Sequence, residues 1–110
     1  MNAVAKPRTA PPALKDATLL REQSYVDGQW IEADSRQRIN VDNPADGALV
    51  ATVPDAGAAE TKRAIAAAEA ALPAWRAMLA KERSAILRKW FDLMVANADD
   101  LAAILTAEQG

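Results

Sequence analysis

The chain has 110 residues, and 27 of its 56 apolar residues are alanine, which leaves 29 larger apolar side chains to build a core. It contains no histidine and no cysteine, which excludes an imidazole base, a thiolate nucleophile, a zinc finger and a disulfide framework. Its 13 basic and 15 acidic residues give a net charge of −2, which provides no positive field for nucleic acid, and no apolar run approaches the ~20 residues that span a bilayer.

Residues 1–23 are predicted to be a disordered tail that includes a short helix over Leu14–Arg21. Residues 1–13 are rich in proline and carry positive charge with no acidic residue. Prolines at positions 7, 11 and 12 disfavour the amphipathic helix of a transit peptide, and no apolar segment of a secretory signal follows. We therefore expect a cytoplasmic protein.

Three or four short strands are predicted next, as a small β-meander. Two β-prone runs at residues 25–26 and 29–31 flank Asp27-Gly28, a dipeptide that tolerates the positive φ angles of a type I′ hairpin turn. Ile39 and Val41 alternate with polar residues, which is typical of a half-buried strand. That strand ends at the turn of residues 43–47, and a further strand over residues 49–53 ends at Pro54.

The second half of the sequence is predicted to be helical. An alanine-rich helix runs from Ala58 to Leu72, where Pro73 ends it. A longer helix runs from about Ala80 to Ala96 and has the widest apolar face in the sequence. This face consists of Ile86, Leu87, Trp90, Phe91 and Met94.

A third helix is predicted to begin near Ala98 and to end at Gly110, a residue that favours helix C-termini. Asp99 and Asp100 lie in its first turn, where the helix dipole favours negative charge. Its buried face is expected to consist of Leu101, Ile104 and Leu105. No strand follows the helices, although a parallel sheet needs strands between them, so residues 24–110 are predicted to be a partial domain that is truncated at its C-terminal end.

Three groups of residues have both a functional and a structural interpretation. Asp99 and Asp100 could clamp a metal, but neighbouring side chains on a helix point about 100° apart, which favours a charge cap. The tryptophans could stack on bases, but their positions favour packing. The basic residues of the second half could bind phosphate, but they alternate with Glu82 on a polar face, which favours a solvated surface. These basic residues are Arg76, Lys81, Arg83, Arg88 and Lys89. The residue types alone therefore indicate no catalytic and no cofactor-binding residue.

Five segments, in order, resemble motifs of the aldehyde dehydrogenase family. The hairpin Tyr25–Trp30 resembles the family's (Y/F)I-x-G-x-W, and the turn Val41–Gly47 resembles its x-x-N-P-x-x-G. Leu72–Trp75 is similar to A-F/L-x-x-W, Lys81–Trp90 to x-x-R-x-x-I-L-x-x-x, and Leu105–Gly110 to L-T-x-E-x-G-K. These segments extend over about 80% of the chain, and those of the second half are most similar to the succinate-semialdehyde dehydrogenase branch.

The resemblance implies an α/β fold, the N-terminal portion of a Rossmann-type cofactor domain with a short hairpin and strands followed by three helices. It implies oxidation of an aldehyde, with succinate semialdehyde favoured over glutarate semialdehyde, and NADP or NAD bound by residues outside this chain. In that family a cysteine attacks the aldehyde, hydride leaves to nicotinamide, and a glutamate-activated water releases the acyl group. Neither residue can be placed on this sequence, so the chain alone is expected to be inactive.

The same resemblance implies partners and one ion site. The full-length enzyme would take a small-molecule aldehyde, would bind neither nucleic acid nor membrane, and would be a homodimer or homotetramer. Many members of the family hold a structural monovalent cation, and carrying its ligands over residue by residue points to Val41, Asp42 and Glu108. Hard cations prefer such oxygen ligands, although Glu108 is also consistent with an ordinary surface acid.

A second interpretation remains open from the residues themselves. The alanine-rich helices allow close approach, so the chain could be a small helical assembly or binding module without catalysis. Its docking face would then be the apolar face of the second predicted helix, residues 86–94.

Overall fold

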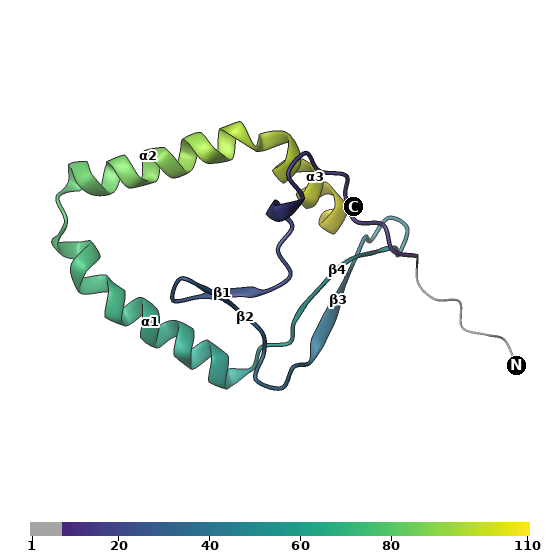
Figure 1. Ribbon diagram of the computed structural model, residues 1–110, viewed down its shortest axis with the longest axis horizontal. Helices are drawn as coiled ribbons and strands as arrows, with labels where there is room; N and C mark the ends of the chain where they lie inside the picture. The colour runs from purple at the N-terminus through teal and green to yellow at the C-terminus, as the bar shows by residue number, and fades with distance from the viewer. Residues whose placement is uncertain (1–7) are drawn as a thin grey trace, which may run out of the picture.

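Residues 8–110 are described by the computed structural model, which places short antiparallel strands before three helices (Figure 1). The strands are β1 (Ser24–Val26), β2 (Gln29–Ile31), β3 (Arg38–Asp42) and β4 (Leu49–Pro54). The helices are α1 (Ala58–Ala77), α2 (Ala80–Ala96) and α3 (Ala98–Gln109), and one turn of 3-10 helix, η1 (Ala17–Leu19), precedes β1. This order confirms the predicted fold class, whereas the disorder expected for residues 1–7 lies outside the described residues.

The first hairpin pairs β1 with β2 through the predicted turn. Asp27 and Gly28 both have positive φ angles, 51° and 73°, as a type I′ turn requires, so this prediction is confirmed. Tyr25 lies opposite Trp30, and their rings meet edge to face with centroids 5.1 Å apart. The guanidinium of Arg21 lies 4.6 Å from the centre of the Trp30 ring, which gives this tryptophan a packing role.

The second hairpin pairs β3 with β4, with Ile39 opposite Val53 and an irregularity in register between Val41 and Asp42. Side chains shape its turn, because Asn43 Oδ1 accepts from the Ala45 nitrogen at 2.9 Å, and Gly47 has a φ of 69°. The expected continuous meander is wrong, because β2 and β3 do not pair and the sheet is two separate hairpins.

Residues 8–20 contact the second hairpin and include one short helical turn. Thr9 bridges Leu49 in parallel, and the Leu49 backbone accepts from Ala10 at 2.9 Å and donates to Arg8 at 2.8 Å. The helix expected over Leu14–Arg21 is present only as η1, which Asp16 caps by accepting from the Thr18 nitrogen.

The prediction that Pro73 ends the first helix is wrong, because α1 continues to Ala77. Proline lacks the N–H that would bond the carbonyl of Glu69, but its fixed φ is compatible with helical backbone. The helix is exposed around this position, so water can solvate the freed carbonyl. α1 ends where the Met78 nitrogen donates to the Trp75 carbonyl at 3.2 Å, and α2 and α3 then begin where they were predicted to begin.

The predicted buried face of α3 is right for Ile104 and wrong for Leu101 and Leu105. Leu105 is 61% exposed and Leu101 is 37% exposed. The side of α3 that is covered carries Asp100, Ala103, Ile104 and Ala107. Spacings of three and four residues place these on one helical face. This face of α3 is turned toward the N-terminal segment because Asp100, which lies on it, accepts hydrogen bonds from that segment.

The three helices form an open arc around the first hairpin rather than a closed bundle (Figure 1). The Cα radius of gyration is 17.9 Å, whereas a compact chain of this length has a value of about 13 Å. The buried apolar residues of the described part are few and lie in or beside the strands: Ala33, Ala48, Val50 and Ala51. No helix within residues 8–110 is long and apolar enough to cross a membrane.

Candidate functional site

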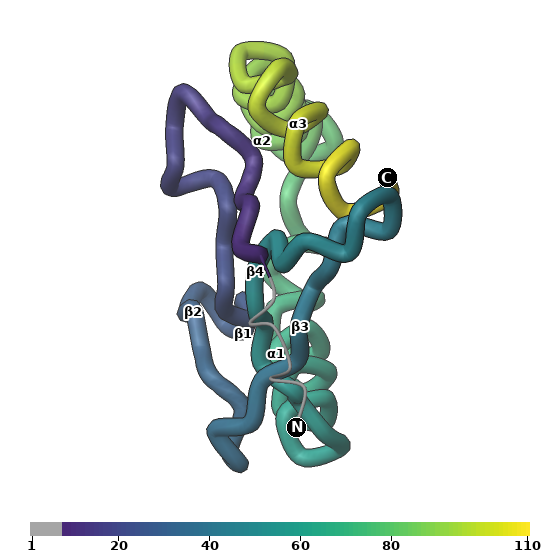
Figure 2. Tube along the Cα trace, turned by 90° about the vertical axis from the view of Figure 1, so that its right-hand side faces the viewer, coloured from purple at the N-terminus to yellow at the C-terminus, as the bar shows by residue number. Residues whose placement is uncertain are grey.

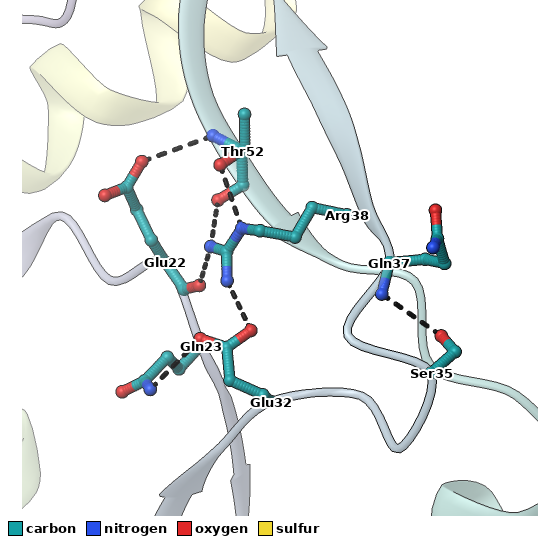
Figure 3. Close-up of polar contacts among 7 residues, drawn as sticks. All are labelled: Glu22, Gln23, Glu32, Ser35, Gln37, Arg38 and Thr52. Atoms are coloured by element: carbon teal, nitrogen blue, oxygen red, sulfur yellow. Dashed lines mark hydrogen bonds and ion pairs between the residues drawn. The ribbon is translucent and has the colours of Figure 1, made fainter.

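Arg38 joins the two hairpins that the backbone leaves unpaired (Figure 3). From the start of β3 its guanidinium donates to the Thr52 hydroxyl at 3.0 Å, to the Thr52 carbonyl at 2.9 Å, to the Glu22 carbonyl and to the Glu32 carboxylate. The Glu22 carboxylate in turn accepts from the Thr52 nitrogen at 3.2 Å. A planar guanidinium has five donors and can therefore bind several acceptors at once. Here these hydrogen bonds connect the two hairpins in place of backbone pairing between strands.

Glu32 is held in its charged form by this junction. Hydrogen bonds from Arg38 and then from Gln23 lower the pKa of its carboxyl. The group is thus an ionised partner of an arginine, which is the opposite of the raised pKa that a general acid or base near neutral pH needs. The junction is structural, and the sequence analysis did not single out Arg38.

A second ion pair connects the first hairpin to α1. Arg63 donates through two nitrogens to the two carboxylate oxygens of Asp34, at 2.9 and 2.6 Å, which lowers the pKa of Asp34. Glu60, in the first turn of α1, accepts a hydrogen bond from the Gly57 nitrogen and so caps the N-terminus of the helix. Open grooves lie between the hairpin and α1, and alanines form much of their helical wall.

Asp100 binds backbone rather than a metal. Its two carboxylate oxygens accept from the Lys15 and Asp16 nitrogens, both at 2.9 Å, and the residue is only 7% exposed. Hydrogen bonds from Asp16 and then Lys15 lower the pKa of Asp100. Asp99 is exposed and lies 4.0 Å from the Lys15 ammonium. The two carboxylates therefore have separate roles, and within residues 8–110 no group of three or more acidic, histidine or cysteine side chains could hold a metal ion.

The three residues proposed for a monovalent cation come from two elements that meet at one end of the fold. Val41 and Asp42 end β3, and Glu108 is exposed in the last turn of α3. The end of α3 lies beside the turn between β3 and β4 (Figure 2), where a Cβ placed on Gly110 would be 2.8 Å from Cγ of Pro44. Backbone carbonyls and a carboxylate form an all-oxygen donor set of the kind that hard cations prefer, so the residue types fit such an ion.

The apolar face of α2 is uncovered. Trp90 is 62% exposed, and Leu87 and Phe91 are about half exposed. Arg83 lies on the same helix with its Nε buried and without a hydrogen-bond partner. The other basic residues of α2 are exposed, and Arg88 pairs with Asp92 at 3.4 Å, as expected for a solvated polar face. Sequence patterning identified the apolar face, but the prediction that Arg83 lies on the polar face is wrong, because the spacing of four to Leu87 and seven to Trp90 puts it on the apolar face with its Nε buried.

Comparison with known proteins places the chain in a family of enzymes. The sequence profile of the aldehyde dehydrogenase family matches residues 30–110, and the chain belongs to this family. Glutarate-semialdehyde dehydrogenase from Pseudomonas aeruginosa is 62% identical over 97 residues. The NADP(+)-dependent succinate-semialdehyde dehydrogenase GabD of Escherichia coli is 52% identical over the same length.

The fold is found in solved structures of related enzymes. The crystal structure of succinate-semialdehyde dehydrogenase from Burkholderia pseudomallei superposes on 89% of this chain with a TM-score of 0.86 and 58% sequence identity. In both kinds of comparison the chain spans about one fifth of the relative's length, 20% of the P. aeruginosa and E. coli enzymes and 20% of the B. pseudomallei crystal chain. The same open arrangement therefore exists inside proteins that are about five times longer.

Proposed function

We propose that this chain is a structural segment of an NAD(P)-dependent dehydrogenase that oxidises an aldehyde with a carboxylate at its far end. The supporting observation is that relatives at 62% and 52% identity are named for glutarate and succinate semialdehyde. The motifs favour succinate semialdehyde, whereas the higher identity favours glutarate semialdehyde. The two substrates differ by one methylene, which is worth only about 1–3 kcal/mol of discrimination in a pocket.

In this proposal the segment contributes framework rather than chemistry. NADP or NAD supplies the hydride acceptor when it is bound. The thiolate and the base of the reaction come from other parts of the enzyme, because this chain has neither cysteine nor histidine and its described carboxylates with shifted pKa values are held ionised. The residues of this chain position the two hairpins and α1 through Arg38 and Arg63.

A chimeric enzyme tests this proposal. In it, this chain replaces the aligned segment of the P. aeruginosa relative. We expect the chimeric enzyme to reduce NADP or NAD with glutarate or succinate semialdehyde, and the purified 110-residue chain to show no turnover. A soluble chimeric enzyme that oxidises neither semialdehyde, while the parent relative does, would overturn the proposal. Turnover by the purified chain alone would refute the framework role.

We also propose that the carbonyls of Val41 and Asp42 and the carboxylate of Glu108 take part in a structural monovalent-cation site, completed by ligands from the rest of a cytoplasmic homo-oligomer. The oxygen donor set and the approach of the α3 terminus to the turn support it. The thermal midpoint of the chimeric enzyme should be higher in sodium or potassium chloride than in choline chloride at equal ionic strength. The difference in midpoint between the salts should become smaller in Glu108→Gln and should be retained in the control Glu69→Gln. An equal decrease in both variants would refute the cation site.

A further inference from the structure

Apolar side chains occupy more than half of the circumference of α2. Because successive residues of a helix are rotated by about 100°, the seven large apolar residues within the helix cover a sector of about 200°. All of them are exposed. They are Ile86, Leu87, Trp90, Phe91, Leu93, Met94 and Val95. A helix with such a wide apolar sector is normally covered on that side by other structure.

Arg83 lies inside this apolar sector. It precedes Trp90 by seven residues and Leu87 by four, so the three share one helical face. Its Nε is buried and has no hydrogen-bond partner, although a buried charged donor is costly unless it is paired. The opposite side of α2 differs, because Arg88 is paired with Asp92 and exposed to solvent. The apolar sector therefore presents one unsatisfied cationic donor amid apolar side chains.

The chain exposes more surface than a compact protein of its size. Its accessible surface is 8621 Å², whereas a compact protein of 11.7 kDa exposes about 5,900 Å². The surplus exceeds the ~800 Å² per partner that a standard interface buries and is in the range of large, permanent interfaces. This amount of exposed surface fits a large permanent partner better than a small transient one.

The comparisons show where such a partner is present. The arrangement of this chain superposes with a TM-score of 0.86 on one fifth of the B. pseudomallei crystal chain, so the other four fifths accompany the same open arc there. We infer that the apolar sector of α2 docks against the polypeptide that forms those remaining four fifths, and that this polypeptide supplies an acceptor, a carboxylate or backbone carbonyls, for Arg83. This inference rests on family membership and on the surface of α2, and it does not depend on which aldehyde is oxidised.

Cysteine labelling of the cysteine-free chain tests the docking. Met94→Cys places a thiol in the apolar sector and Lys89→Cys places a matched thiol on the polar side of the same helix. In the isolated chain both thiols should react rapidly with a maleimide. In the chimeric enzyme, the peptide that contains Cys at position 94 should be labelled at least about tenfold more slowly, whereas the peptide with Cys at position 89 stays reactive. Mass spectrometry separates these peptides from the other cysteines of the relative.

Several results would overturn the docking. Equal labelling of the two thiols in the chimeric enzyme would exclude it. If the thiol at position 94 of the isolated chain becomes protected from the maleimide as the concentration rises, and sedimentation shows a dimer, the apolar sector binds a second copy of this chain instead. If the chimeric enzyme does not fold, the intact P. aeruginosa relative with cysteines at the positions aligned with Met94 and Lys89 gives the same comparison.

Substitution of Arg83 tests the proposed acceptor. In the chimeric enzyme Arg83→Met should lower the thermal midpoint by about 5 °C or more, and Arg83→Lys should lower it less, because a charge and donors remain. The control Arg88→Met removes an exposed pair and should change the midpoint by about 1 °C or less. Equal shifts for Arg83→Met and Arg88→Met would show that no acceptor is bound there. The readout is stability, so inactivity toward a semialdehyde would not affect the result.

Discussion

The carboxylate of Asp100 holds the backbone of Asp16, 84 residues earlier in the chain, with Oδ2 2.9 Å from the amide nitrogen. Its other oxygen binds the nitrogen of Lys15 at the same distance. One side chain at the start of α3 thus fixes a segment that has little secondary structure of its own. The contact also sets the rotation of α3, because the face that carries Asp100 is the face that is covered.

Replacement of this carboxylate should release the N-terminal segment. In Asp100→Asn of the chimeric enzyme, one oxygen and the negative charge are lost, and we expect hydrogen-exchange protection of the Lys15 and Asp16 amides to fall by about tenfold or more. Asp99→Asn is the matched control, because Asp99 is exposed and accepts from neither amide. If both variants retain full protection, Asp100 does not hold the segment.

The same contact should respond to acid in a defined direction. Because the pKa of Asp100 is lowered in the folded state, its contact stabilises the folded state above the unfolded-state pKa of about 3.9 and is lost as the pH falls through the lower folded value. Protection of the two amides, corrected for intrinsic exchange, should be constant from pH 7 to 5 and should fall below about pH 4. Asp100→Asn should show no such fall, and a loss between pH 7 and 6 would contradict the assignment.

Removal of Arg38 should separate the hairpins. Arg38→Ala leaves the Glu32 carboxylate and the Glu22 carbonyl without their shared donor, so we expect the chimeric enzyme to lose stability against urea, and to lose more than the control variant does. Lys62→Ala, on the exposed side of α1, is the control and should cost less than about 0.5 kcal/mol. A cost for Arg38→Ala as small as that of the control would show that the junction contributes nothing.

Two glycines with similar backbone should respond differently to alanine. Gly47 and Gly110 have φ angles of 69° and 86°, so alanine costs about 1 kcal/mol of strain at either position. Only at Gly110 would the new Cβ also approach the Pro44 ring, at 2.8 Å, whereas nothing lies within 4 Å at Gly47. Gly110→Ala should therefore lower the thermal midpoint of the chimeric enzyme more than Gly47→Ala does. Equal shifts would mean that the α3 terminus does not rest against this turn.

The isolated chain should behave as an open structure. With Trp90, Phe91 and their neighbours exposed, we expect strong binding of the dye ANS, weak near-ultraviolet circular dichroism and a tendency to aggregate. A sharp near-ultraviolet spectrum with a two-state melt and no dye binding would contradict this expectation.

Local features of the fold could be predicted from the sequence, and features set by distant contacts could not. The Asp27-Gly28 turn and the start of α2 at Ala80 depend on a few adjacent residues, and both are confirmed. Pro73 carries a strong local signal for a helix end, but an exposed helix tolerates the loss of one hydrogen bond, so α1 continues. The rotation of α3 depends on Asp100 and a segment 84 residues away, which no periodicity of α3 reveals.

The candidate site shows the same division. The resemblance to family motifs predicted that Val41, Asp42 and Glu108 belong to one site. In the structure, the end of α3 lies beside the turn that follows β3. Arg38 and Arg63 carry no sequence signal that separates them from surface arginines, because their roles depend on which acceptors the fold places nearby. Arg83 is the arginine of the x-x-R-x-x-I-L motif, but the motif does not reveal that its Nε is buried without a partner.

The binding of Asp100 to Lys15 and Asp16 has a consequence for biosynthesis. As the polypeptide leaves the ribosome, each hairpin and each helix can form from residues that have just emerged, because their contacts are local. Residues 15 and 16 emerge well before residue 100, but Asp100 can bind them only after it has been translated. The backbone of Lys15 and Asp16 therefore stays without this partner while more than 80 further residues are made, and it is accessible to chaperones until α3 has begun to form.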